Sequence, residues 1–308
     1  MRSTPLPVRE TSYFDIQRRV AAHKTQESWD EIPHVSLVLE LDMTHLLAFR
    51  RKLLGSPEFA GTRFTINTLL LKVLAESLRE SPRMHAFVGY SRGASTGRVT
   101  VLEDINIAIP MLLPSGETIT PVLHQVDKKP LRELCAAMED LKRRVDNTNA
   151  SLLLFEAGRR DTYQNLFEGR FGVLRRLFSA YLGKGRLHLP PRKEQRAHLQ
   201  IPATDRVTPD DLTSATVLVS NIGNAVPGMR LNVGLLEVIR PQTTAIAVTP
   251  IRKQPVVVTD ENGNDRVAIR EVCPITVCCD HRAVDFFHIE GFFKKAVAIS
   301  EEPERWLQ

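Results

Sequence analysis

His281 lies in the segment CDHRAVD (279–285), where its residue type and its neighbours could do proton-transfer chemistry. The β-branched run at 272–278 predicts a buried strand before it, and the apolar stretch at 286–300 predicts a helix after it. Imidazole has an ordinary pKa near neutrality, so a histidine fixed here could take a proton from a thiol or a hydroxyl. Asp285 follows four residues later and could lock the loop. A hydrogen-bonded structural histidine is the alternative, and spacing alone leaves both open.

The four cysteines form neither a disulfide framework nor a paired CxxC zinc pattern. They are Cys135, Cys273, Cys278 and Cys279. Strand alternation sends Cys278 and Cys279 to opposite faces, which argues against a metal site with His281. We therefore expect no metal, buried cysteines and a reducing cytoplasm. Cysteine chemistry through Cys279, on the same face as His281, is a weaker alternative.

Length and composition place the chain among soluble globular proteins. It has 308 residues, of which 43% are hydrophobic and 25% charged, enough for a sizeable core. No apolar run approaches the roughly 20 residues needed to cross a bilayer, and the first seven residues lack the apolar core of a signal peptide. The sequence contains neither GxGxxG nor GxxxxGK[ST], so no nucleotide-phosphate cradle is predicted.

The net charge of +5 is concentrated in one segment. Residues 151–200 contain ten Lys or Arg against four acids, which is +6 and leaves −1 for the rest. A charge confined to one segment favours a local anionic partner, either a membrane surface or an acidic protein, over nucleic-acid binding. A solvated helix packed on its own protein is the alternative reading.

The elements that must position His281 predict a mixed fold. Helices are expected at 13–28, 42–54, 65–80 and 129–145, with possible helices at 152–155 and 173–182. Strands are expected at 34–41, 99–102, 105–113, 119–126, 216–221, 238–239, 245–248, 255–259 and 267–277. Residues 190–192 are expected to be a solvated connection. Early helices followed by a long run of strands favour an α+β layered fold over a doubly wound sheet.

Several blocks, in order along nearly the whole chain, resemble the catalytic domain of the dihydrolipoamide acyltransferases. They are IPHV (32–35) with LDMT (41–44), the apolar helix at 64–82, DINIA (104–108) with PSG (114–116) and PV (121–122), VSNIG (219–223), and DHRAVD (280–285). This family forms the core of 2-oxoacid dehydrogenase complexes. The resemblance implies a chloramphenicol acetyltransferase-like, two-layer α+β sandwich with a mixed sheet.

The resemblance also implies roles for individual residues. His281 would be the base, Ser220 would supply a hydroxyl to the oxyanion, and Asp285 would orient the loop. Arg282 and Asn221 are assigned to binding coenzyme A. The physical alternative is that Ser220 ends its strand by hydrogen-bonding a turn, which Asn221 would help to shape.

The family resemblance implies substrates and partners as well. The acyl group would move between coenzyme A and a dihydrolipoyl group carried by another chain, or another small acceptor. In the family the site lies between subunits of a trimer, with the serine and the histidine on different chains, so a homotrimer is implied, with a larger assembly as an extension. A scaffold or regulatory subunit that has kept the fold and lost turnover is the alternative.

The sequence departs from the family pattern at four places. The glycine expected after Asp285 is Phe286, which should alter the channel wall, and the asparagine expected after the apolar helix is His85. We expect a single catalytic domain over 1–308, without a lipoyl or a peripheral-subunit-binding domain. A basic insertion at about 151–205 is longer than the family's connection.

Overall fold

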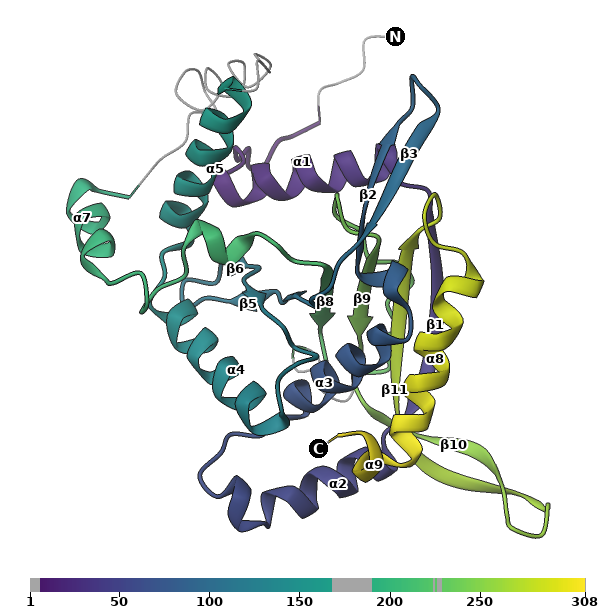
Figure 1. Ribbon diagram of the computed structural model, residues 1–308. Coiled ribbons are helices and arrows are strands. Elements are labelled where there is room, and N and C mark those ends of the chain that lie inside the picture. Colours follow the sequence, from purple (N-terminus) through teal and green to yellow (C-terminus); the bar gives the residue numbers. More distant parts are fainter. Residues whose placement is uncertain (1–5, 168–189, 224, 226–228, 308) are drawn as a thin grey trace.

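The computed structural model describes residues 6–167, 190–223, 225 and 229–307, and it contains a mixed sheet of seven strands (Figure 1). The strand order is β1-β11-β9-β8-β4-β7, and β10 pairs with β11. Strand β8 runs parallel to β4 and β9, whereas the other pairs are antiparallel. The bounds are β1 His34–Asp42, β4 Ile107–Ala108, β7 Val122–Leu123, β8 Val217–Asn221, β9 Thr244–Val248, β10 Arg252–Thr259 and β11 Asp265–Asp280.

Helices pack on one face of this sheet and enclose the main core (Figure 1). The helices that contribute to this core are α2 Thr44–Leu54, α3 Ile66–Arg79, α4 Leu131–Asp146, α8 Phe286–Glu301 and α9 Pro303–Trp306. A small cluster on the opposite face contains Ile32, Val238, Ala245 and Cys278. The two-layer arrangement follows because sheet and helices each bury one apolar face against the other.

The remaining elements lie around this body. Helix α1 (Ile16–Glu31) and helix α5 (Ala150–Phe167) contact each other, and helix α7 (Arg192–Gln200) lies at one edge (Figure 1). Two small sheets pair β2 (Ala86–Ser91) with β3 (Thr96–Val101) and β5 (Met111–Leu112) with β6 (Thr118–Ile119). Short 3-10 turns span Pro57–Phe59, Pro82–His85 and Pro209–Leu212. None of the described helices is both long and apolar enough to cross a membrane.

Helix α3 shows how the local sequence fixes an element. The Thr65 hydroxyl accepts a hydrogen bond from the Thr68 backbone N–H at 3.1 Å, which satisfies one of the free donors at the helix start. Ten of the fourteen residues of the helix are buried. The wide apolar stripe expected at 65–80 is therefore confirmed as the central helix of the core.

The packing of helix α8 depends on a close approach near its middle. A Cβ on Gly291 would lie 2.6 Å from the Glu80 backbone oxygen, at the end of α3. The Phe292 backbone N–H donates to the Ser81 hydroxyl at 2.9 Å, and Phe292 itself is fully buried. These contacts fix α8 against α3, and so fix the loop that precedes α8.

The structure confirms the expected helices at 13–28, 42–54, 65–80 and 129–145 and the strands at 34–41, 99–102, 216–221, 245–248, 255–259 and 267–277, with shifted ends. The expected strands at 105–113 and 119–126 are wrong in extent, because each is divided into two short strands. The strand expected at 238–239 is wrong. Residues 190 and 191 lie outside any helix or strand, as expected for the connection at 190–192, and α7 begins at Arg192. The possible helix at 152–155 is part of α5, and the one at 173–182 lies outside the described residues.

Candidate active site

His281 lies in the loop between the last strand and α8, as the sequence predicts. Strand β11 ends at Asp280, and helix α8 begins at Phe286. The backbone N–H of His281 donates to the Pro33 carbonyl at 2.9 Å, which ties the loop to the segment before β1. The imidazole side chain is 53% exposed. The backbone of His281 is therefore held in place, whereas its imidazole ring is exposed to solvent.

The surroundings of Nδ1 determine the tautomer of His281. Nδ1 lies 3.1 Å from the Val284 carbonyl oxygen, which can only accept a hydrogen bond. It also lies 3.5 Å from an Asp285 carboxylate oxygen. Nδ1 must then carry the proton in the neutral ring, and Nε2 carries the lone pair. Among the described residues, no group makes a hydrogen bond to Nε2. A free lone pair on a ring nitrogen is what general-base chemistry requires.

Asp285 is placed by the start of the helix. It is the N-cap residue of α8, and its backbone N–H donates to Nδ1 of His288 at 3.0 Å. Its carboxylate lies 3.8 Å from the same His288 nitrogen. His288 was missed by the sequence reasoning, although a polar residue three positions after an N-cap residue is the pattern of a reciprocal cap.

A buried ion pair holds the turn on its other side. The Asp280 side chain is fully buried and accepts from the Arg282 guanidinium at 2.6, 2.9 and 3.2 Å and from the Arg282 backbone N–H at 3.0 Å. The Asp280 carboxylate raises the pKa of Arg282 above its ordinary value, chiefly through these hydrogen bonds. The guanidinium also lies over the ring of Tyr90, with 5.5 Å to the centroid. Sequence reasoning missed the positioning role of Asp280 and Arg282, because residue spacing does not reveal that the carboxylate is buried.

Ser220 lies at some distance from His281 within one chain. The register places Ser220 beside Ala247 and Ala247 beside Thr276, and His281 lies five residues beyond Thr276. With about 3.3 Å per residue and about 4.8 Å between strands, the two Cα atoms are roughly 19 Å apart. A single chain thus brings His281 and Asp285 together and leaves Ser220 outside hydrogen-bond reach of both.

The residues around Ser220 form a turn with its own hydrogen bonds. Nδ2 of Asn221 donates to the Asn67 side-chain oxygen at 2.9 Å, and Oδ1 of Asn221 accepts from the Gly223 N–H at 2.8 Å. Asn221 therefore makes the contacts expected if its role is to shape the turn after Ser220. Ser220 is half-buried as a residue, and no hydrogen bond to its hydroxyl is found in the described part of the chain.

The cysteines do not extend this site. All four are free and buried. Burial raises the pKa of Cys279 to about 12, so at neutral pH it is a thiol and a poor nucleophile. Cys278 and Cys279 lie on opposite faces, in the small cluster and in the main core respectively. Among the described residues no group of three or more His, Cys, Asp or Glu could hold a metal ion.

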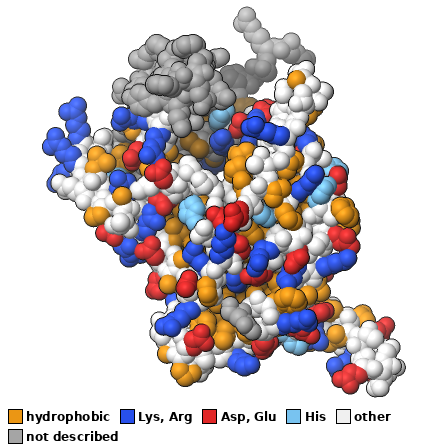
Figure 2. Space-filling view, in the orientation of Figure 1, with side chains coloured by type: hydrophobic (Ala, Val, Ile, Leu, Met, Phe, Trp, Pro, Cys, Tyr) orange, Lys and Arg blue, Asp and Glu red, His pale blue; other side chains and the backbone are white. Residues whose placement is uncertain are grey.

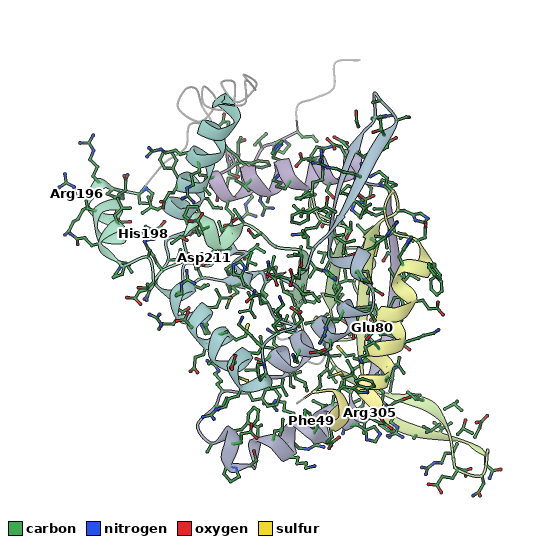
Figure 3. The ribbon with its side chains drawn as sticks, viewed as in Figure 1. Phe49, Glu80, Arg196, His198, Asp211 and Arg305 are labelled. Atoms are coloured by element: carbon green, nitrogen blue, oxygen red, sulfur yellow. The ribbon has the colours of Figure 1, made fainter. Side chains whose placement is uncertain are left out.

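A hollow lies beside helix α7, and it contains none of the residues from 281 to 285. This groove of about 390 Å³ is lined by residues that include Glu117, Asp146, Glu194 and His198. Figure 3 shows His198 on the inner side of α7 and Arg196 pointing outward. Burial, and then Arg206, lower the pKa of His198, so it is neutral at pH 7. Figure 2 shows charges of both signs interspersed over the face in view.

The chain is similar to known proteins over most of its length. The family model described as 2-oxoacid dehydrogenases acyltransferase (catalytic domain) matches residues 9–156 and 192–308. The chain is 24% identical over 271 residues to the dihydrolipoyllysine-residue acetyltransferase component of the Corynebacterium glutamicum pyruvate dehydrogenase complex, a match over 87% of this chain and 30% of that protein. It is 22% identical over 295 residues to the lipoamide acyltransferase component of the Bacillus subtilis branched-chain alpha-keto acid dehydrogenase complex, over 92% of this chain and 53% of that protein. The chain thus spans about a third to a half of these relatives.

The fold is shared with a solved assembly. The cubic core of the pyruvate dehydrogenase multienzyme complex superimposes with a TM-score of 0.63 at 19% identity, covering 99% of this chain and 100% of that chain. The expected α+β fold is therefore confirmed. The family model leaves residues 157–191 unmatched, which lie within the segment expected to be an insertion.

Proposed function

Because the chain belongs to the family of 2-oxoacid dehydrogenase acyltransferase catalytic domains, we propose that it moves an acyl group between coenzyme A and an acceptor thiol. The acceptor is a dihydrolipoyl group carried by another chain, or another small acceptor. The observation that carries this proposal is the state of His281, whose Nδ1 is occupied by the Val284 carbonyl and whose Nε2 is unpartnered among the described residues.

The mechanism uses proton transfer and no covalent acyl-enzyme. Nε2 of His281 takes the proton of the incoming thiol, and the thiolate attacks the thioester carbonyl carbon. The tetrahedral oxyanion accepts a hydrogen bond from the hydroxyl of Ser220. Collapse of the tetrahedral intermediate breaks the bond between the carbonyl carbon and the sulfur of coenzyme A. The leaving thiolate takes the proton from the imidazolium. The Asp285 carboxylate, 3.5 Å from Nδ1, stabilises the imidazolium in between.

We infer that the working site forms between subunits. Ser220 and His281 are roughly 19 Å apart in one chain, so a single chain cannot offer both to one carbonyl group. A closed ring in which Ser220 of one copy faces His281 of the next removes this separation, and a trimer is the assembly we propose. Assembly of such trimers into a larger particle is an extension of the same proposal.

The protruding hairpin of β10 and β11 supports self-association. Val257 pairs with Val267 and Pro255 with Ile269 across this hairpin. Val257, Val267 and Ile269 are 64%, 72% and 75% exposed. Apolar side chains that share one face of a projecting hairpin are typical of a surface that another chain covers.

Substitution of His281 tests the chemistry. His281→Ala should lower the rate of acyl exchange between acetyl-CoA and dihydrolipoamide by about 10²–10⁴-fold, because a general base is lost. Exposed His124→Ala is the matched control. Equal rates in the wild type and in His281→Ala would refute the enzyme proposal and would support an inactive scaffold of the same fold, the alternative that Phe286 favours.

Mixing two inactive variants tests the shared site. Ser220→Ala should lower turnover about 10²–10³-fold, as the loss of an oxyanion donor does. After unfolding and refolding together, equal amounts of Ser220→Ala and His281→Ala chains should regain activity in about a quarter of the sites, those that pair an intact serine with an intact histidine. No recovery in trimers of mixed composition would place both residues of each site in the same chain.

We also propose residues that bind coenzyme A and partners of the chain. We assign Arg282 and Asn221 to coenzyme A binding, although both side chains also make contacts within the chain. A lipoyl-bearing protein is the proposed donor or acceptor partner. An anionic surface or an acidic protein is the proposed partner of residues 151–200. If a variant without this segment sediments with anionic liposomes as the wild type does, a membrane is excluded as the partner.

A further inference from the structure

The carboxylate of Asp285 lies between two imidazole rings. One of its oxygens is 3.5 Å from Nδ1 of His281, and the other is 3.8 Å from Nδ1 of His288. The Asp285 side chain is 66% exposed, so surrounding atoms cover little of it. The position of the carboxylate therefore depends on what holds the backbone of Asp285 in place.

Two hydrogen bonds tie the backbone of Asp285 to His288. The N–H of Asp285 donates to Nδ1 of His288 at 3.0 Å, and the N–H of His288 donates to the carbonyl of Asp285 at 2.9 Å. The His288 side chain is only 23% exposed, and the ring of Phe287 meets it edge-on with centroids 6.0 Å apart. A well-covered ring thus fixes the peptide unit of the residue whose carboxylate faces His281.

The hydrogen bond to Nδ1 also sets the charge of His288. A backbone N–H can only donate, so Nδ1 of His288 carries a lone pair and Nε2 carries the proton. An imidazolium has an N–H on both nitrogens and could not accept this bond. His288 is therefore neutral while it holds Asp285, and the carboxylate keeps its full charge. A lysine or an arginine at this position would instead form an ion pair with the carboxylate.

Resting on the proposed acyl transfer, we propose that His288 is a positioning residue, which holds the Asp285 carboxylate beside His281 and leaves its negative charge free for the imidazolium. That charge is needed only after His281 has taken the proton of the thiol. His288 thus acts on the chemical step and not on the binding of coenzyme A. Because the carboxylate is largely exposed, its charge accounts for a factor of about five in rate at most.

Three substitutions of His288 test this role in the exchange between acetyl-CoA and dihydrolipoamide. His288→Ala removes the acceptor and should lower kcat about three- to fivefold, with the KM for acetyl-CoA within about twofold of the wild type. His288→Gln supplies a side-chain oxygen at the same position of the helix and should restore most of kcat. His288→Arg supplies a cation and no acceptor, and should lower kcat at least as much as alanine does. Lys294→Ala, an exposed change on the same helix, is the control.

Combination with Asp285→Asn separates positioning from a purely structural role. Asparagine keeps the backbone N–H at this position and removes the charge of the side chain. In this background His288→Ala should leave kcat unchanged, because there is no carboxylate left to position. The loss of stability that His288→Ala causes in urea unfolding should remain in both backgrounds, since the hydrogen bond to the Asp285 N–H is lost in each.

The proposal is overturned by an unchanged kcat in His288→Ala, by equal fold losses in the two backgrounds, or by a glutamine variant as slow as the alanine variant. If His288→Ala does not fold, the glutamine and arginine variants carry the test, and equal kcat values for these two would overturn the proposal as well. Failure of the proposed acyl transfer is distinguishable, because the wild type and His281→Ala would then exchange acyl groups at equal rates.

Discussion

Removing Arg282 should destabilise the protein more than removing Asp280, although both substitutions break the same ion pair. Asp280 is fully buried, whereas the Arg282 side chain retains 17% exposure. Arg282→Ala therefore leaves a carboxylate without solvent, and Asp280→Ala leaves a guanidinium that can still reach water. An unpaired buried charge is the costly product of breaking such a pair.

The magnitude follows from the contacts that are lost. Breaking a buried pair costs about 3–5 kcal/mol. We expect a loss of unfolding free energy near the upper end, about 4–5 kcal/mol, for Arg282→Ala, and near the lower end, about 3 kcal/mol, for Asp280→Ala. The three guanidinium contacts are not additive, because they hold one pair of groups.

Urea unfolding followed by tryptophan fluorescence, at one protein concentration, measures both losses. Arg79→Ala is the control, because the exposed Arg79 side chain pairs with Glu76 at 3.2 Å. That variant should lose no more than about 1 kcal/mol. A larger loss for Asp280→Ala than for Arg282→Ala, or losses no larger than that of the control, would refute the reasoning from burial.

The remaining predictions concern pH and packing. Burial lowers the pKa of His85, whose Nδ1 has no hydrogen-bond partner among the described groups. The unfolded chain therefore binds the proton more readily than the folded chain does. The free energy of unfolding should then fall as pH drops below about 6.5, with a slope of up to about 1.4 kcal/mol per pH unit. Urea unfolding between pH 5 and 7.5 should show a smaller slope for His85→Asn, with exposed His23→Asn as the control, and equal slopes would contradict this cause. Gly291→Ala should cost about 1–3 kcal/mol, since its Cβ would meet the Glu80 backbone oxygen at 2.6 Å. Thermal unfolding should leave Gly93→Ala, which meets nothing within 4 Å, near the wild type, and a tolerated Gly291→Ala would argue that α8 can shift.

The sequence by itself determined the main elements and the base candidate. Local periodicity is sufficient for α3 and β11, because a wide apolar stripe and a β-branched run each fit only one kind of element over that length. It was insufficient for the segments at 105–113 and 119–126. There the pairing of short strands in two different sheets decides where each strand ends, and that pairing involves residues distant in the chain.

Only the tertiary structure decided which groups surround His281. The proton on Nδ1 depends on the Val284 carbonyl, and the loop depends on the Asp280–Arg282 pair and on the Pro33 carbonyl, a contact between residues about 250 positions apart. Sequence spacing carries no information on the Pro33 contact, because the pairing of β1 with β11 sets it, and the two local contacts depend on the conformation that the folded chain imposes on the loop. The same register separated Ser220 from His281 within one chain, and this separation is the physical reason for proposing a site shared between subunits.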